Sequence, residues 1–357
     1  MDVNMNFKFR KNSGIGEIKL NKKKVKTPLL MFGYRIGDRP KAWLNKDINI
    51  DSLMLNAYEF VKNNGRSEKV LEQGIHAFLN FNKFVIMDSG GFYFLKSGNI
   101  DVQPLQILEY MEKSGCDMGV TLDFPLEYSN KKENKKRIEI TVKNSNKMIE
   151  ESKIPLMTVI HGFSSRQIDY FTEKLNYDPE IIGLGSQAGL LYPFRINEVK
   201  KIIDTAIYVR KKYPNRFFHL LGIGSPRLVP IFFLIGVDSL DAKTWLWKAV
   251  RHMIYYRGRI VCVKNDGNSW TPSYNGENYH CDCPVCRKYG FSGLIGEDKW
   301  VNRGLHNAWT YQEEIKTIRK KIEEGELSNY VETLLKGTIY KNVYHYTVKK
   351  IHNEEIS

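Results

Sequence analysis

Residues 84–125 read FVIMDSGGFYFLKSGNIDVQPLQILEYMEKSGCDMGVTLDFP, and this segment decides the fold. A short apolar run at 84–87 leads into a glycine-rich turn, an amphipathic stretch at 104–113 and a second apolar run at 118–122. A strand, a helix and another strand in this order are typical of a βαβ unit, in which the two strands are parallel. The same alternation recurs on both sides of the segment.

The alternation of strands and helices extends from residue 27 to residue 240. Apolar runs that we interpret as strands lie at 27–32, 84–87, 118–122, 155–160, 181–184, 217–221 and 237–240. Amphipathic stretches separate several of them, at 104–113, 164–175 and 197–212. At least seven such strands favour a closed barrel over an open doubly wound sheet. The fold class that we predict is therefore α/β, a (β/α)8 TIM barrel.

Composition and charge narrow the class of protein. The 357 residues are 42% hydrophobic and 26% charged, which excludes general disorder and allows a full core. No apolar run reaches the ~18 residues of a membrane span, and the N-terminus lacks the apolar stretch of a signal peptide, so we expect a cytoplasmic protein. The net charge of +14 predicts an acidic polymer as partner, although a Lys/Asn-rich composition can also raise the charge.

Cysteine spacing predicts a metal site. Three of the five cysteines form a C-x-C-x-x-C group, and a histidine follows after 19 intervening residues. Three thiolates and one imidazole complete a closed tetrahedral zinc site, which indicates a structural metal. The expected ligands are Cys281, Cys283, Cys286 and His306. His280 is an alternative ligand, but it is adjacent to Cys281 in the chain. Cys116 and Cys262 are interpreted as single core thiols.

The ends of the predicted strands carry the candidate active site, because catalytic groups of TIM barrels lie there. These positions hold Asp88, Asp123, His161, Gly183, Gly222 and Asp241. One aspartate alone could be a helix N-cap, but three in a basic protein indicate chemistry. The two glycines of DSGGF at 88–92 let a flat ligand approach the main chain, and Phe92 offers an aromatic face. No GxGxxG pattern exists, which excludes a Rossmann nucleotide site.

Together these motifs resemble the tRNA-guanine transglycosylases and their DNA-modifying relatives, which exchange guanine in a polynucleotide for a 7-deazaguanine. The sequences of these motifs are most similar to those of the archaeal-type branch. The matching pieces run in family order: DSGGF at 88–92, LDFP at 122–125, HG at 161–162, GLG at 183–185, HLLGIGSP at 219–226, GVDSLD at 236–241, CDCPVC at 281–286 and LHN at 305–307.

The resemblance implies a TIM barrel at 1–255, a zinc-binding subdomain with a closing helix at 256–325, and a C-terminal tail at 326–357. It also implies that Asp241 is the nucleophile at the sugar C1′ and that Asp88 is the general acid and base. Asp238 competes as nucleophile by chemistry alone, but the family motif favours Asp241. The base-binding positions that it implies are Ser89, Phe92, Asp123, His161, Gly183, Leu184, Leu221 and Gly222.

Two departures from the family pattern shape the expected substrate. The family usually has Gln where His161 stands, which leaves the 7-deazaguanine derivative open. The chain stops at residue 357 without the C-terminal RNA-binding domains of the archaeal enzymes. This resembles the phage and bacterial branch that inserts 7-cyano-7-deazaguanine into DNA, which implies host cytoplasm if a phage encodes the chain.

Alternatives stay open at this point. The near alternative is the same exchange in tRNA, of the queuosine or archaeosine type. A different one is a non-catalytic paralogue that binds nucleic acid or a catalytic partner, and a third is an unrelated barrel glycosidase. The resemblance also implies a possible homodimer through the zinc region, and a helper protein could open the strand.

Overall fold

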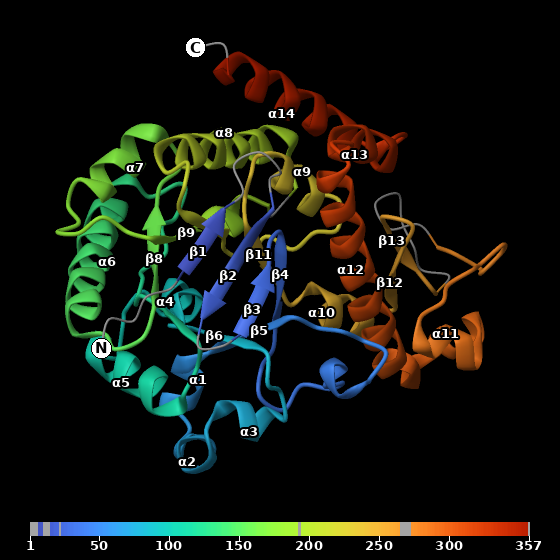
Figure 1. Ribbon diagram of the computed structural model, residues 1–357, viewed down its shortest axis with the longest axis horizontal. Coiled ribbons are helices and arrows are strands. Elements are labelled where there is room, and N and C mark those ends of the chain that lie inside the picture. Colours follow the sequence, from blue (N-terminus) through green and yellow to red (C-terminus); the bar gives the residue numbers. More distant parts are fainter. Residues whose placement is uncertain (1–5, 10–14, 21–22, 192–193, 265–272, 356–357) are drawn as a thin grey trace.

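The computed structural model describes residues 6–9, 15–20, 23–191, 194–264 and 273–355. Its centre is a closed barrel of eight parallel strands, which confirms the predicted (β/α)8 fold (Figure 1). Around the barrel the strands follow chain order, and β11 pairs with β4 to close the ring. The strands are β4 (Leu29–Gly33), β5 (Ser52–Asn56), β6 (Phe84–Asp88), β7 (Met118–Val120), β8 (Leu156–His161), β9 (Ile181–Gly185), β10 (Phe217–Leu220) and β11 (Ser239–Ala242).

Helices surround the barrel (Figure 1). The amphipathic stretches predicted from the sequence form α5, α7 and α8, whose apolar faces pack toward the strands. Within the described residues the helices after β5 are α1 (Ala57–Val61), α2 (Asn64–Gln73), α3 (Ile75–Leu79), α4 (Gly91–Ser97), α5 (Pro104–Ser114), α6 (Lys131–Glu151), α7 (Ser165–Thr172), α8 (Ile196–Lys212), α9 (Val229–Leu234) and α10 (Thr244–Val250).

A small antiparallel sheet, which the sequence analysis did not predict, covers the N-terminal end of the barrel. It consists of β1 (Asn6–Phe9), β2 (Gly16–Leu20) and β3 (Lys23–Lys26). Its apolar side chains join the cluster inside the barrel, where Ile18 packs with residues at the starts of strands such as Phe84. Because this end is plugged, the opposite end, where the strands finish, remains for a site.

The region after the barrel strands forms a second hairpin and a set of C-terminal helices. The hairpin is β12 (Met253–Tyr256) and β13 (Arg259–Cys262), followed by α11 (Pro284–Tyr289). The long helix α12 (Trp300–Glu323) packs on α10 and reaches β4, so it also closes the helical layer of the barrel. The tail forms α13 (Leu327–Leu335) and α14 (Tyr340–Glu355), which contact α9 and α8. The division at residues 255 and 325 stays a prediction.

Among the residues that the structure describes, the helices are too short or too polar for one of them to cross a bilayer.

Candidate active site and metal centre

Three aspartates meet where the barrel strands end. Asp88 is the last residue of β6, Asp123 follows β7, and Asp241 lies on β11. Burial, followed by the negative charges of Asp123 and Asp241, raises the pKa of Asp88 to about 8. The backbone N–H groups of Gly90 and Ser89 offset only part of this effect. Asp88 therefore holds a proton at neutral pH and can deliver it to a leaving group.

Asp241 is fixed by one donor on the neighbouring strand β10 and one in the segment that follows it. The backbone N–H of Gly222 donates to Asp241 Oδ1 over 2.6 Å, and His219 Nε2 lies 3.2 Å from the same oxygen. Gly222 has φ +72°, a left-handed conformation that favours glycine and lets its N–H turn toward the carboxylate. The other ring nitrogen of His219 lies 2.7 Å from Ser239 Oγ. The carboxylate of Asp241 is thus held while its side chain stays 20% exposed.

Asp238, the competing nucleophile, lies at the other end of the barrel. Its carbonyl accepts a hydrogen bond from Leu29 N at the start of β4, and its carboxylate accepts bonds from Arg210 Nη2 over 2.5 Å and from Phe218 N over 2.8 Å. Burial raises the pKa of Asp238 to about 6 although Arg210 opposes the shift. Its carboxylate is buried and paired, far from the strand ends that carry Asp241.

Asp123 is enclosed by its neighbours. Ser89 Oγ lies 3.3 Å from Oδ1, and His161 Nε2 lies 3.1 Å from Oδ2. Gly91 packs against the same carboxylate so closely that an added Cβ would lie 2.2 Å from Asp123 Oδ1. A side chain at this position would therefore displace the carboxylate of Asp123.

His161 lies between Ser186 and Asp123. The ring is fully buried, and its Nδ1 lies 2.8 Å from Ser186 Oγ. Ser186 Oγ already accepts a bond from Leu126 N, so its hydroxyl proton is available for Nδ1. Nε2 faces Asp123 Oδ2 at 3.1 Å, a close polar contact that lies outside hydrogen-bond geometry. His161 was predicted to bind the base, and the structure places it behind Asp123.

The other expected base-binding residues have different surroundings. Gly183 lies on β9 beside Leu221, because a Cβ added to Gly183 would meet Leu221 Cδ1 at 3.1 Å. The side chain of Leu184 is fully buried in the layer between strands and helices, and its carbonyl accepts a bond from Leu221 N. The hydroxyl of Ser89 donates to Thr121 O over 3.0 Å. Phe92 is 63% exposed.

Sequence reasoning assigned no role to His219, Ser186 or Gly91. For His219 a signal exists in the alternation of side chains along a strand, since residues two apart share a face. Ser239 and Asp241 share a face of β11, and His219 is the register partner of Ser239 on β10. Polar residues at such paired positions in apolar strands indicate a shared hydrogen-bond network.

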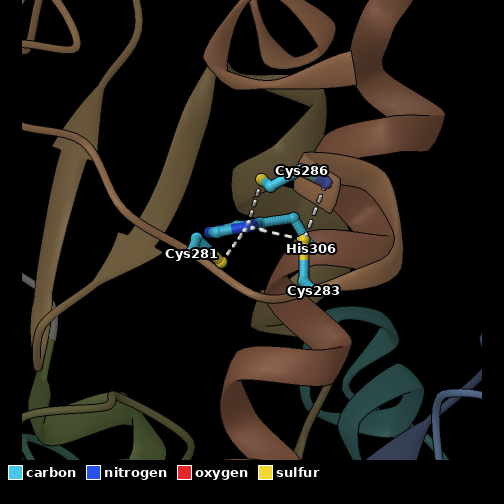
Figure 2. A group of neighbouring side chains, drawn as sticks. All are labelled: Cys281, Cys283, Cys286 and His306. Carbon is cyan, nitrogen blue, oxygen red and sulfur yellow. Dashed lines mark hydrogen bonds between the residues drawn. The ribbon is translucent and has the colours of Figure 1, made fainter. Parts of the chain in front are cut away.

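A separate cluster of side chains offers metal ligands. Figure 2 shows Cys281, Cys283, Cys286 and His306 converging, and their ligand atoms all lie within 4.8 Å of one another. His306 Nε2 lies 2.8 Å from Tyr255 O, which places the ring proton there and directs the Nδ1 lone pair at the sulfurs, 3.4 Å from that of Cys283. This donor set fits a tetrahedral metal ion such as zinc. The alternative ligand His280 is outside this cluster, with an 80% exposed side chain near Asp282.

Comparisons with known proteins show which family the chain resembles. The family model described as Queuine tRNA-ribosyltransferase matches residues 11–338. The chain is 28% identical over 355 residues to a tRNA-guanine(15) transglycosylase of Pyrococcus abyssi, a match that covers 93% of this chain and 57% of the relative. Proteins of the same name from Sulfolobus acidocaldarius and Nanoarchaeum equitans are 29% and 26% identical, covering 80% and 99% of this chain and 56% and 82% of the relatives. The chain therefore spans less than two thirds of the length of several of these relatives.

Proposed function

The chain belongs to the queuine tRNA-ribosyltransferase family, and from this premise we propose that it exchanges guanine in tRNA for a 7-deazaguanine. The proposal rests on the convergence of Asp88 and Asp241, whose surroundings suit them to different chemical roles. Asp88 is kept protonated by its surroundings, whereas the carboxylate of Asp241 receives a backbone N–H and faces a buried histidine. An acid and a nucleophile side by side suit the displacement of a base from a sugar.

In the first half of the proposed reaction Asp241 attacks the sugar C1′. A bond forms between C1′ and a carboxylate oxygen, the bond from C1′ to the guanine nitrogen breaks, and its electron pair goes to the departing base. Asp88 donates its proton to that base, which leaves as neutral guanine. The product of this step is a sugar ester of Asp241 and an ionised Asp88.

The second half reverses these steps with another base. Asp88 accepts a proton from the incoming 7-deazaguanine, whose ring nitrogen then attacks C1′. The ester bond breaks, and its electron pair returns to the carboxylate of Asp241. The enzyme regains its starting protonation state, so the cycle needs no redox cofactor or nucleotide.

Recognition of the base is proposed for Asp123. A carboxylate accepts hydrogen bonds only, which matches the two adjacent N–H donors on the Watson–Crick edge of guanine. His161 and Ser89 support this carboxylate from behind, and Gly91 leaves room for it. Phe92 and Leu221 are proposed to contact the two faces of the ring, and Gly183, Leu184 and Gly222 to border it.

The relatives favour tRNA as the polymer over the DNA expected from the sequence. Their printed names are tRNA-guanine(15) transglycosylases, and the matched segment covers most of this chain. The excess of positive charge suits either polymer. In both polymers the target guanine must leave its stack, which costs on the order of a few kcal/mol. DNA remains the alternative that the experiment must separate.

For the metal centre we propose one structural zinc ion held by Cys281, Cys283, Cys286 and His306. Zinc bound there would join the segment before α11, α11 itself and α12, and would leave no open position for substrate. The catalytic aspartates belong to a different part of the chain. A homodimer, a helper protein and a cytoplasmic location stay predictions.

The direct test compares the two polymers. Purified protein is incubated with radiolabelled guanine and, in separate reactions, with unmodified tRNA or guanine-containing DNA. We expect label to enter tRNA, and to enter neither polymer with Asp241→Asn. Label that enters DNA alone would reject tRNA as substrate. Absence of label in both polymers with wild-type protein would support a non-catalytic paralogue.

A further inference from the structure

A cluster of cations lies near an exposed tryptophan beside the nucleophile; one of them, Arg227, also packs over the ring of Tyr340, 5.3 Å from its centroid. The members of the cluster are Arg227, in the loop after β10, and Trp247, Lys248 and Arg251, on and after α10. The loop that contains Arg227 begins at Gly222, whose N–H holds Asp241, and α10 begins three residues after Asp241. Thr244 Oγ1 donates to Gly224 O over 2.9 Å and joins the two elements.

The cations of this cluster lack acidic partners. Within the described part of the chain, no carboxylate lies within ion-pair distance of Arg227, Lys248 or Arg251, whereas nearby Lys243 pairs with Asp38 over 2.8 Å. Arg227 Nε is buried and has no hydrogen-bond partner there. Burial and the charges of Arg251 and Arg227 lower the pKa of Lys248. Three mutually repelling cations indicate that an anion completes the cluster.

Trp247 adds an aromatic platform. Its side chain is 43% exposed, and the guanidinium of Arg251 lies 3.4 Å from the ring centroid. Lys248 Nζ lies 5.4 Å from the same ring. An exposed aromatic ring combined with cations is the arrangement by which proteins hold single-stranded nucleic acid, with a base stacked on the ring and phosphates on the cations.

The C-terminal end of α10 is a competing explanation for these charges, because helix ends of this kind favour cations. It accounts for Lys248 and Arg251, which lie at that end. It does not account for the exposed indole, nor for Arg227, which comes from a different element and has Tyr340 as a neutral aromatic partner but no carboxylate partner in the described part of the chain. A ligand with both anionic groups and flat rings accounts for all four side chains.

We propose that Arg227, Trp247, Lys248 and Arg251 bind an unpaired stretch of RNA next to the target nucleotide. Trp247 stacks against a base, and the three cations hold the adjoining phosphates. The inference rests on the proposed function for the choice of RNA. Because the loop after β10 contacts Asp241 through Gly222 and α10 begins three residues after Asp241, a strand held here is kept in register with the nucleophile.

The test measures RNA binding as a function of salt. The double variant Arg227→Gln/Lys248→Gln is compared with Lys316→Gln/Lys320→Gln, which removes the same charge from α12, where Arg319 binds Pro28 O at the opposite end of the barrel. The probe is a labelled, unstructured oligoribonucleotide of about 12 nucleotides. We expect the slope of log affinity against log salt to fall by about 1–2 for the first variant only. Equal slopes for both variants would overturn the proposal.

Stacking is tested separately at Trp247. Trp247→Ala is expected to weaken binding of the same probe about tenfold, while Trp247→Phe keeps most of the affinity. Melting temperatures within a few degrees of wild type ensure that all variants are folded. Equal affinity of Trp247→Ala and wild type would overturn the stacking role, and preference for a deoxyribose probe would overturn the choice of RNA. Wild-type protein that binds RNA here but exchanges no base would instead reject the proposed function.

Discussion

The imidazole of His219 lies against the carboxylate of Asp241, with 3.2 Å between Nε2 and Oδ1. The histidine is fully buried, and Ser239 contacts its other nitrogen over 2.7 Å. Both partners of the imidazole, Ser239 and Asp241, lie on β11, so the ring of His219 links β10 to β11. We infer that His219 positions the nucleophile and takes no part in contacts with substrate.

Replacing His219 tests this positioning role. His219→Ala is expected to lower kcat for base exchange about 10- to 100-fold with a smaller change in KM, because a misplaced carboxylate costs rate more than binding. His219→Gln, whose amide can still donate to Oδ1, is expected to recover part of the rate. His345→Ala removes an exposed histidine on α14 and serves as the control. If His219→Ala and His219→Gln lost kcat to the same extent and also lost melting temperature to the same extent, the role of His219 would be structural alone.

The raised pKa of Asp88 predicts a pH dependence of activity. Below about pH 8 the carboxyl is protonated and can serve as an acid, and above this pH the proton is lost. We expect single-turnover release of guanine to fall as the pH rises through this value. A rate that is unchanged from pH 7 to pH 10 would contradict the role of Asp88 as acid.

The same shift predicts a pH dependence of stability. Between the ordinary pKa of 3.8 and about 8 the folded protein binds a proton at Asp88 that the unfolded chain does not. The free energy of unfolding therefore falls as the pH rises through this window. Asp88→Asn should be more stable than wild type at pH 9, on the order of 1–3 kcal/mol because the residue keeps some solvent contact, and nearly equal at pH 4. Thermal unfolding measures the difference.

Gly91 should tolerate no side chain. In Gly91→Ala the new Cβ would lie 2.2 Å from Asp123 Oδ1, so the carboxylate must move. We expect guanine affinity, measured by calorimetry, to fall about tenfold or more, because a misplaced acceptor loses its hydrogen bonds. Gly65→Ala on α2 is the matched control, because nothing lies within 4 Å of its added Cβ. Unchanged guanine affinity in Gly91→Ala would show that Asp123 does not recognise the base.

The metal centre is expected to contribute to folding. Wild-type protein should contain about one equivalent of zinc, and Cys283→Ser should lose the metal and become unfolded or insoluble. Cys116→Ser, which alters another buried cysteine, should keep both metal and solubility. Elemental analysis and melting temperature measure the two outcomes. Soluble, active Cys283→Ser protein without zinc would show that the metal is dispensable.

The barrel could be predicted because its strands are continuous apolar runs between amphipathic helices. β5 was missed because Ser52–Asn56 holds only three apolar residues between polar ends. The N-terminal sheet was missed because β2 and β3 are short and alternate apolar with charged residues. The closing helix that the resemblance implied within 256–325 is α12, which begins at Trp300 and ends at Glu323. The first turns of α12 lie beside the cysteine cluster, so their apolar residues do not follow a regular helical pattern.

The catalytic positions could be predicted because the end of a strand is recognisable in sequence. What could not be predicted is which neighbour each side chain meets. The link between His219 and Ser239 depends on the register of β10 with β11, and that between Ser186 and His161 depends on a loop in which Ser186 has φ +68°. Sequence alone also leaves open whether His161 faces the base or lies behind Asp123.

The most direct measurement of the central claim is the chemical identity of a trapped intermediate. Protein and tRNA are mixed without an incoming base, denatured rapidly and digested, and the peptide linked to ribose is sequenced by mass spectrometry. The proposed mechanism predicts an ester on Asp241, absent in Asp241→Asn and retained in Asp298→Asn. A sugar adduct on any other residue, or base exchange that persists in Asp241→Asn, would contradict it.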